Sequence, residues 1–482
     1  MNNKIRFEKN IEKNGESGLN ETKNGGAEVK RFGIGQKLAF GQGSFAAWFI
    51  NSAFNVWVFT FYFTAVRLPV IYIMLAFILW TIWNAINDPL IGYLSDRTHT
   101  RWGRRKPYII LGTIPVLIIE IILWIPPTTN HIITFIYLLI ILVCYDTFYT
   151  MVTLSFDALF PELYTSVKER AQVNTIKQVF STIGLICAFL IPGLFINDIS
   201  ESMGYLINGI VTTIIVGATL FIGIVWGAKE REEFAMDHQH EFDFIKGIKY
   251  AFKNKGFVLY TLMFFFYEYV TLLLATVVQL YGKHILHSTP FQTSLLLGVM
   301  FIVGIFTVVI WMKLDIILGS RKAYAIAIIV YILGSLPLLF VTNYLFALIT
   351  VVFMGIGFGG MLYFIYLIIA DVIDEDELET GVRREGSFFG ITNFFMRLAM
   401  ILSIVTVSLV FTSTGWEEYA PNPGANIILG LRILIVVFPG IALGLTLLCL
   451  YLYPYPKERV EEIKTALADL HNIKMERVRK KE

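Results

Sequence analysis

Ionisable and amide side chains interrupt the apolar stretches of this sequence at a few positions, and the chemistry open to them is the binding of ions and polar solutes. Asn84 and Asp88 stand four residues apart, as do Asn51 and Asn55, so a helix would place each pair on one face. A carboxylate within an apolar stretch is costly to bury and is a functional candidate by default. The alternative is that Asp88, beside Pro89, only packs against a neighbouring helix or belongs to a latch, a set of paired charges that holds helix ends together.

A second polar face occurs further along the chain. Four polar residues follow one another at spacings of three, four and four, namely Asp146, Tyr149, Thr153 and Asp157. The face that they share is poorly suited to lipid, so we expect it to line a cavity or to pack on a neighbouring helix. Asp157 is either a binding residue or part of a latch at the membrane surface, and the latch is slightly favoured.

The stretch 172–194 contains Lys177 and Gln178 side by side. Two carboxylates are candidate partners for Lys177, namely Asp157 and Asp88. The alternative is that this lysine extends along its helix towards the cytosolic membrane surface.

Two later apolar stretches carry single charges. Glu268 stands within FFFYEYVTLLL, where a lone carboxyl is suited to carry a coupled proton or to serve as a hydrogen-bonded packing acid. Arg397 follows Asn393 by one helical turn. A buried arginine needs an anionic partner, and Asp88 is the first choice and Glu268 the second.

These residues lie on segments that are long enough to cross a membrane. The chain has 482 residues, of which 56% are hydrophobic and 16% charged, whereas soluble domains carry about 25% charged residues. Each apolar segment can span a hydrocarbon core of ~30 Å as a helix. Twelve such segments are expected, at 36–63, 70–95, 107–126, 132–160, 172–194, 205–227, 257–281, 291–314, 322–341, 344–370, 387–411 and 426–453. The sequence therefore predicts an all-α polytopic membrane protein with twelve transmembrane helices in two six-helix bundles.

The distribution of lysine and arginine sets the expected orientation. Basic residues concentrate in loops of one parity, which the positive-inside rule assigns to the cytosol, so both termini are expected on the cytosolic side of the cell membrane. A segment within the central loop, 241–254, is amphipathic, and we expect it on the inner membrane surface. The expected parts are a disordered tail (1–31), a first bundle (32–227), a central loop (228–256), a second bundle (257–454) and a C-terminal tail (455–482).

Composition also argues against several classes of protein. The net charge of +2 gives no sign of the excess of basic residues that is typical of nucleic-acid binding. The three cysteines have no paired spacing, so neither a disulfide framework nor a zinc site is expected. No metal-ligand cluster and no nucleophile with a matching base stands out, so we expect neither an enzyme nor a bound cofactor. The expected partners are a small-molecule solute and the lipid bilayer, and we expect a monomer.

The loop GYLSDRTHTRWGRRKPYIILG (92–112) is the most specific motif. An acid at the end of one span precedes a dense basic cluster, and the acid, the arginines and the helix ends can pair as a cytosolic latch. The alternative is a generic positive-inside loop. The latch candidates are Gly92, Asp96, Arg97, Arg101, Gly103, Arg104 and Arg105.

This loop resembles the one between spans two and three of the major facilitator superfamily. The chain is most similar to its glycoside–pentoside–hexuronide:cation symporter family, to which melibiose permease belongs. The resemblance implies the major facilitator fold and secondary transport of a sugar, glycoside or similar small polar solute by alternating access, coupled to H+ or Na+. Five stretches carry it in family order, namely KLAFGQGSF (37–45), IWNAINDPLIGYLSDRTHTRWGRRKPYIILG (82–112), ALFPEL…KERAQ (158–172), ADVIDEDELETGVRREGSFFG (370–390) and GLRILIVVFPGI (430–441).

By this resemblance, the candidates for cation coupling are Asp88, Asn84, Glu268 and Arg397. The family presents two aspartates at the positions of Asn84 and Asp88, so the amide in this chain removes one negative charge from the implied site. Arg397 matches a lysine that completes the family's charge network. Glu268 matches a polar position of the family's cavity.

The implied substrate cavity departs from the family at several positions. Trp48 stands where sugar-binding members have an aspartate, and it either stacks on a sugar ring or faces lipid. Tyr149 matches a cavity tyrosine, whereas Thr153 stands in place of an aspartate and Asp157 in place of a tryptophan. Gln178 replaces an arginine. The full set of cavity candidates is Trp48, Asn51, Asn55, Tyr149, Thr153, Asp157, Lys177, Gln178 and Asn393.

Three other functions stay open at this point. Similar carriers move lysolipids, so an amphipathic solute is the first alternative, and an uncoupled facilitator is the second. A non-transporting sensor or scaffold on a carrier fold is the rival from a different class. Polar residues concentrated on inward faces favour transport, because a scaffold has no need of them.

Overall fold

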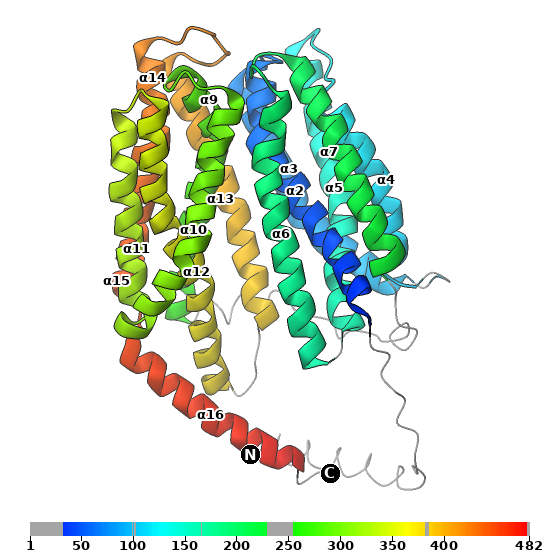
Figure 1. Ribbon diagram of the computed structural model, residues 1–482, viewed down its shortest axis with the longest axis vertical. Helices are drawn as coiled ribbons and strands as arrows, with labels where there is room; N and C mark the ends of the chain where they lie inside the picture. The colour runs from blue at the N-terminus through cyan, green and yellow to red at the C-terminus, as the bar shows by residue number, and fades with distance from the viewer. Residues whose placement is uncertain are drawn as a thin grey trace.

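The computed structural model describes residues 32–98, 100, 103–164, 166–228, 254–380 and 385–479. Within these residues the chain is α-helical and contains no β-strand. Figure 1 shows a first bundle on one side of the molecule. It comprises α2 (Ile34–Thr64), α3 (Val70–Arg97), α4 (Lys106–Ile122), α5 (His131–Leu163), α6 (Val167–Phe195) and α7 (Ser202–Ile222), which continues as the π-helical turn Gly223–Gly227.

A second bundle lies beside the first (Figure 1). Its last membrane segment, Ala425–Leu452, is interrupted by a π-helical turn, Ile433–Val437, between α14 and α15. A further helix, α16 (Lys457–Arg479), lies across one end of this bundle. The helices of the second bundle are α9 (Lys255–His284), α10 (Pro290–Leu318), α11 (Ser320–Ser335), α12 (Tyr344–Thr380), α13 (Glu385–Thr414), α14 (Ala425–Arg432) and α15 (Phe438–Leu452).

Among the described residues, ten helical segments are long and apolar enough on their own to cross a membrane. Helices α2 and α4 account for the remaining two of the twelve expected spans. α4 has 17 residues, slightly fewer than the ~20 that a span needs. α2 is enclosed by protein, with Phe49, Trp57 and Val58 at 0% exposure. This enclosure lets α2 carry polar residues that a lipid-facing helix avoids.

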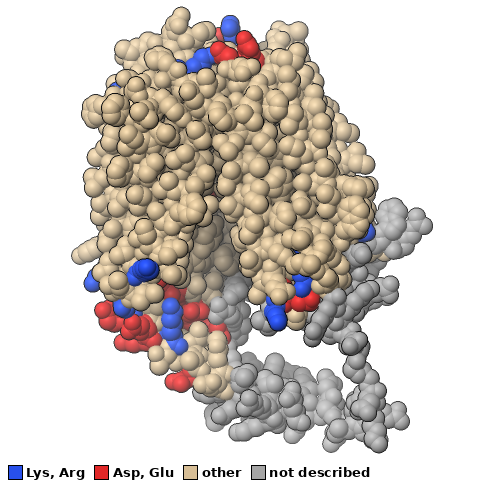
Figure 2. Space-filling model, viewed as in Figure 1, with Lys and Arg blue, Asp and Glu red and all other residues tan. Residues whose placement is uncertain are grey.

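The two bundles meet at the end of the molecule opposite α16. There, Phe63 packs against Trp416 with ring centroids 5.1 Å apart, and the Val70 N–H donates to the carbonyl oxygen of Glu417 over 2.8 Å. Nearer α16, Figure 2 shows the surface hollowed along the boundary between the bundles. The structure is therefore closed at one end and open towards the other, as alternating access requires of one of its states.

Helix α16 was not predicted from the sequence, which indicated only a tail at 455–482. Lys464 Nζ lies 3.9 Å from Asp371 Oδ1 in the C-terminal third of α12. Ile463 and Leu467, four residues apart, are buried, so α16 packs through an apolar stripe. The expected amphipathic segment of the central loop and the N-terminal tail lie outside the described residues.

An ion pair between the bundles reinforces the closed end. Lys283, at the end of α9, donates to the Asp198 carboxylate and, over 2.7 Å, to the Ser200 hydroxyl. Burial raises the pKa of Asp198, but the hydrogen bonds from Lys283 and Ser200 and the charge of Lys283 outweigh burial, so this pKa lies below its usual range. The carboxylate therefore stays ionised, and the pair stays formed, until the pH falls through that lowered pKa.

Replacing Asp198 by Asn should loosen the closed end, because Lys283 loses its charged partner. We expect the population of a longer distance between spin labels on cysteines at Glu201 and Glu418 to rise roughly two- to fivefold at pH 7, as an ion pair of this exposure allows. The native cysteines are removed first. Wild-type protein should show the same rise as the pH falls through the lowered pKa of Asp198.

The matched control is Glu417→Gln, a change in an exposed acid at the same end, which should leave the distances unchanged. Identical distances in Asp198→Asn and wild-type protein would show that the ion pair does not hold this end closed. Attaching the labels to intact cells with a membrane-impermeant reagent also reports whether this end is extracellular.

Candidate functional site

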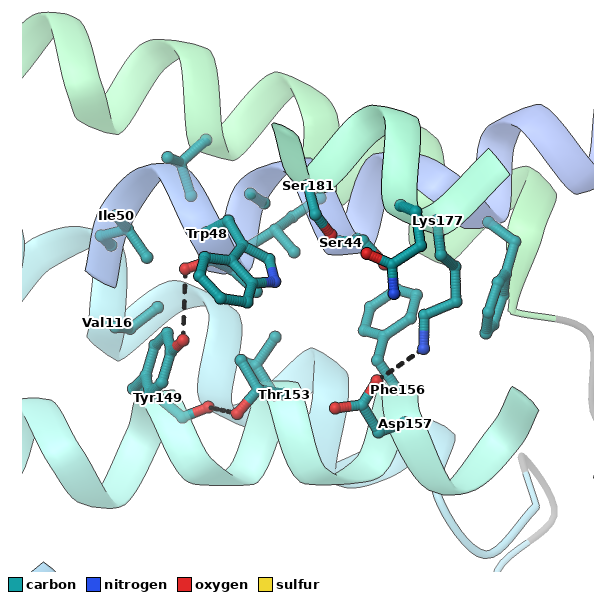
Figure 3. Close-up of a pocket in the computed structure, with 18 of the residues that line it drawn as sticks. Ser44, Trp48, Ile50, Val116, Tyr149, Thr153, Phe156, Asp157, Lys177 and Ser181 are labelled. Atoms are coloured by element: carbon teal, nitrogen blue, oxygen red, sulfur yellow. Dashed lines mark hydrogen bonds and ion pairs between the residues drawn. The ribbon is translucent and has the colours of Figure 1, made fainter. Parts of the chain in front are cut away.

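A cavity with both polar and apolar lining opens mainly between α2, α5 and α6 of the first bundle (Figure 3). Its volume is about 160 Å³. Phe156 and Val116 contribute apolar parts of its wall. The cavity candidates from the sequence that line it are Trp48, Tyr149, Thr153, Asp157, Lys177 and Gln178. Ser44, Asn174 and Ser181 also line it, and the sequence analysis had not singled them out.

An ion pair joins α6 to α5 at this cavity. Lys177 Nζ lies 2.8 Å from Asp157 Oδ1, so Asp157 rather than Asp88 is its partner. The Asp157 side chain is 69% exposed, which leaves its second oxygen open to a solute. Trp48 projects from α2 into the same space (Figure 3) and is 49% exposed. About half of this side chain is therefore open to a solute.

Some polar groups of the cavity are already satisfied, and others are open. The Tyr149 hydroxyl donates to the carbonyl oxygen of Ala47 over 3.2 Å, and the Thr153 hydroxyl donates to the carbonyl oxygen of Tyr149 over 3.0 Å. Within the described part of the chain, Asn174 and Gln178 have no side-chain hydrogen bond, so their amides are free to bind a solute.

A close helix contact fixes how α6 presents its cavity residues. A Cβ on Gly184 would lie 2.5 Å from the Phe45 carbonyl oxygen of α2, so only glycine permits this approach. Ser181 and Lys177 precede Gly184 by three and seven residues and lie on the same helix face. The contact at Gly184 therefore orients both side chains towards the cavity.

A second set of polar residues links the two bundles. Arg397 of α13 forms an ion pair with Asp88 of α3 and donates to the side-chain oxygen of Asn84. The Thr150 hydroxyl of α5 donates to the other Asp88 oxygen over 3.0 Å. The Arg397 side chain is 15% exposed and that of Asp88 37%. The carboxylate thus remains open enough for a small ion to reach.

Asp146 is a member of this network that the sequence analysis did not select. It is 3% exposed, and its carboxylate accepts hydrogen bonds from the amides of Asn84 and Asn87, the latter over 3.1 Å. Asn84 thus bridges the two charged groups, because its amide nitrogen donates to Asp146 while its oxygen accepts from Arg397. The available signal was the position of Asp146 on the polar face of its helix, three residues before Tyr149.

Four sequence candidates lie outside both sets. Asn51 and Asn55 bond to each other, with 3.3 Å between the Asn55 amide nitrogen and the Asn51 oxygen. Asn393 is exposed on α13, without a described hydrogen bond to Arg397. Glu268 is half-buried on α9, and within the described residues its carboxylate forms no ion pair with Arg397.

The basic-loop residues that are described pair within the first bundle. Arg104 Nη2 lies 2.7 Å from Glu162 Oε1, and Arg105 donates to Ser95 over 2.6 Å. The Arg97 guanidinium lies over the Tyr93 ring, 4.2 Å from its centroid. Gly92 lies on α3, and Gly103 has a φ of 101°, which favours glycine. The Asp96 side chain and Arg101 lie outside the described residues.

Comparison with known proteins assigns this architecture to a family of transporters. Residues 39–457 match the family described as MFS/sugar transport protein. The uncharacterized symporter YnaJ of Bacillus subtilis is 25% identical, over 93% of this chain and 98% of its own length. The isoprimeverose transporter of Lactiplantibacillus pentosus is 22% identical, over 88% of this chain and 89% of its own.

The fold is shared with solved transporter structures. The nucleoside transporter NupG superposes with a TM-score of 0.65 at 15% identity, covering 87% of this chain and 99% of its own length. The fold and the family confirm the resemblance that the sequence motifs indicated, and they assign the chain to transporters rather than enzymes. The chain belongs to the MFS/sugar transport protein family.

Proposed function

We propose that this chain binds a sugar or a similar small polar solute in the cavity between α2, α5 and α6 and carries it across the membrane by alternating access. The observation that carries the proposal is the combination of an open aromatic face, Trp48, with unpaired amides and a charged pair around one small space. An aromatic face suits the apolar side of a sugar ring. The amides and the Asp157–Lys177 pair suit its hydroxyl groups.

The size of the cavity argues for a small solute. Its volume of about 160 Å³ is below the ~300 Å³ at which pockets begin to enclose drug-sized ligands. A solute of about one sugar ring is consistent with this volume. A lysolipid needs a long apolar channel as well, and the ion pair and free amides of this cavity suit a polar solute better.

Uptake into proteoliposomes, with a panel of radiolabelled sugars, tests this assignment. For the sugar that is transported, Trp48→Ala should raise the half-saturating concentration roughly tenfold, about 1.4 kcal/mol, through loss of the stacking face. Trp48→Phe should recover most of the affinity. The control Trp226→Phe changes an exposed tryptophan outside the cavity and should have no effect. Equal affinity in Trp48→Ala and wild-type protein would exclude the proposed binding mode.

The charge network supports a proposal about coupling. When both carboxyls are ionised, Asp88 and Asp146 bring two negative charges and Arg397 brings one positive charge, which leaves one negative charge uncompensated within the membrane. Uncompensated charge is expensive there, so one monovalent cation, H+ or Na+, would neutralise the network. Asp146 thereby supplies the second carboxylate that Asn84 does not. Glu268 and Asn393 are further candidates for coupling and solute contact. Both are polar residues on helices of the second bundle, which alternating access brings into contact with the solute as well.

Replacing Asp146 by Asn should uncouple transport, because the network then has no excess charge for the cation to neutralise. We expect gradient-driven accumulation to be lost while exchange of internal for external solute is retained. The control Glu120→Gln neutralises another buried acid of the first bundle and should leave accumulation intact. Imposed Na+ and H+ gradients identify the ion. Undiminished accumulation by Asp146→Asn would move the coupling site elsewhere, with Glu268 as the next candidate.

We further propose that both termini and the hollow between the bundles face the cytosol, so that the structure is the inward-open state. The excess of lysine and arginine in the corresponding loops supports this orientation. The basic loop then acts there as a latch that affects turnover more than solute binding. Labelling of a cysteine introduced at Glu201, with an impermeant reagent outside the cell, tests the orientation. If the reagent does not reach that position, the orientation is the opposite of the one proposed.

A further inference from the structure

A groove lies on the outside of the second bundle, where the turn between α10 and α11 meets the connection from α15 to α16. Its volume is about 730 Å³, and none of its lining residues belongs to the cavity or to the charge network. Three cationic side chains and one carboxylate line it, namely Arg321, Lys322, Lys457 and Glu458. The remaining lining residues are Ile317, Leu318, Ala325, Leu447, Leu450, Tyr451 and Pro456.

The cationic groups are held at the groove mainly by neutral acceptors. The Arg321 guanidinium donates to the carbonyl oxygen of Tyr451 and lies 6.0 Å from the centroid of its ring. Lys457 Nζ donates to the carbonyl oxygen of Ile316 over 2.8 Å and also lies 4.0 Å from the exposed Glu461 carboxylate. Within the described residues, Lys322 is exposed and forms no ion pair. Arg321 and Lys322 thus keep their attraction for an external anion, and Lys457 keeps part of its own because its pair with Glu461 is long and exposed.

The other wall of the groove is apolar and continues the lipid-facing surface. Tyr451 is 75% exposed and Ile317 68%, and both lie at the ends of membrane helices. Leu447 lies one turn before Tyr451 on α15 and extends the apolar wall along the helix. The groove therefore has a cationic side at the end of the bundle and an apolar side along the bilayer.

We propose that this groove binds the headgroup of an anionic phospholipid, with the phosphate between Arg321, Lys322 and Lys457 and an acyl chain along Leu447 and Tyr451. The three cations exceed the two nearby carboxylates, Glu458 of the lining and Glu461 beside Lys457, by one charge, which suits an anionic lipid better than a zwitterionic one. Basic pockets between membrane helices bind phosphate-bearing lipid headgroups in this manner.

A lipid in this groove would also connect two parts of the second bundle. Lys457 is the first residue of α16, and Arg321 and Lys322 are in the first turn of α11. A phosphate shared between them would hold α16 against the bundle. Lipid composition would thereby affect the docking of a helix that also contacts α12 through Lys464 and Asp371.

Native mass spectrometry of the full chain, titrated with phosphatidylglycerol, phosphatidylcholine or inorganic phosphate, tests the proposal. Wild-type protein should bind phosphatidylglycerol at least tenfold more tightly than phosphatidylcholine. Inorganic phosphate, which lacks an acyl chain, should compete only weakly. Equal affinity for the two lipids would overturn the proposal, and so would phosphate that binds as tightly as the lipid, because the groove would then be a site for free anions.

The variant Lys322→Gln/Lys457→Gln should weaken phosphatidylglycerol binding about 25-fold, at about fivefold for each charge near the surface. The matched control Lys313→Gln removes an exposed charge of α10 that does not line the groove, and binding should be retained. Unchanged binding in the double variant would contradict the assignment. If that variant does not fold, as judged by thermal unfolding without lipid, the competition between lipids on wild-type protein still decides the question.

Discussion

An ion pair between the two bundles, Asp88 with Arg397, is the interaction on which this account depends. A guanidinium in an apolar setting requires an anion, and its partner is carried by the other bundle. The contact between the bundles at this level is therefore a charged one. Any change in the charge of Asp88 alters the attraction between the bundles. Binding of a cation at Asp88 would thereby affect how the two bundles are held together.

Helix α5 brings the charge network and the cavity together. Thr150 and Asp146 bond to the network, whereas Tyr149, Thr153 and Asp157 line the cavity. The two sets alternate along a few turns of one helix, so a small rotation or shift of α5 would change both. Solute binding and cation binding would then be coupled through a single rigid element, without a long chain of intervening contacts.

The sequence predicted a large part of the fold, because apolar segments long enough to cross a membrane indicate helices that contact lipid. It also predicted that Arg397 would pair with Asp88 and that Asp157 was one of two partners for Lys177. A buried charge has few possible partners in a membrane, so such pairs can be deduced from helical spacing and the cost of burial.

Other parts of the site could not be deduced in this way. Asp146 was on a recognised polar face, but its contact with Asn84 depends on how α5 and α3 are rotated about their axes, and spacing within one helix does not determine that rotation. Asn51 and Asn55 satisfied the same spacing rule and bond to each other instead. Helix α16 is mostly polar, so hydropathy gave no sign that it packs on the second bundle.

The most direct test of the central claim is a double-mutant cycle on the ion pair, with solute exchange in proteoliposomes as the measurement. Asp88→Asn and Arg397→Gln should each slow exchange, because each leaves a buried charge without its partner. The double variant should be less impaired than the sum of the two single effects, with a coupling free energy of about 0.5–3 kcal/mol. Simple additivity of the single effects would contradict a direct interaction between the bundles at this pair.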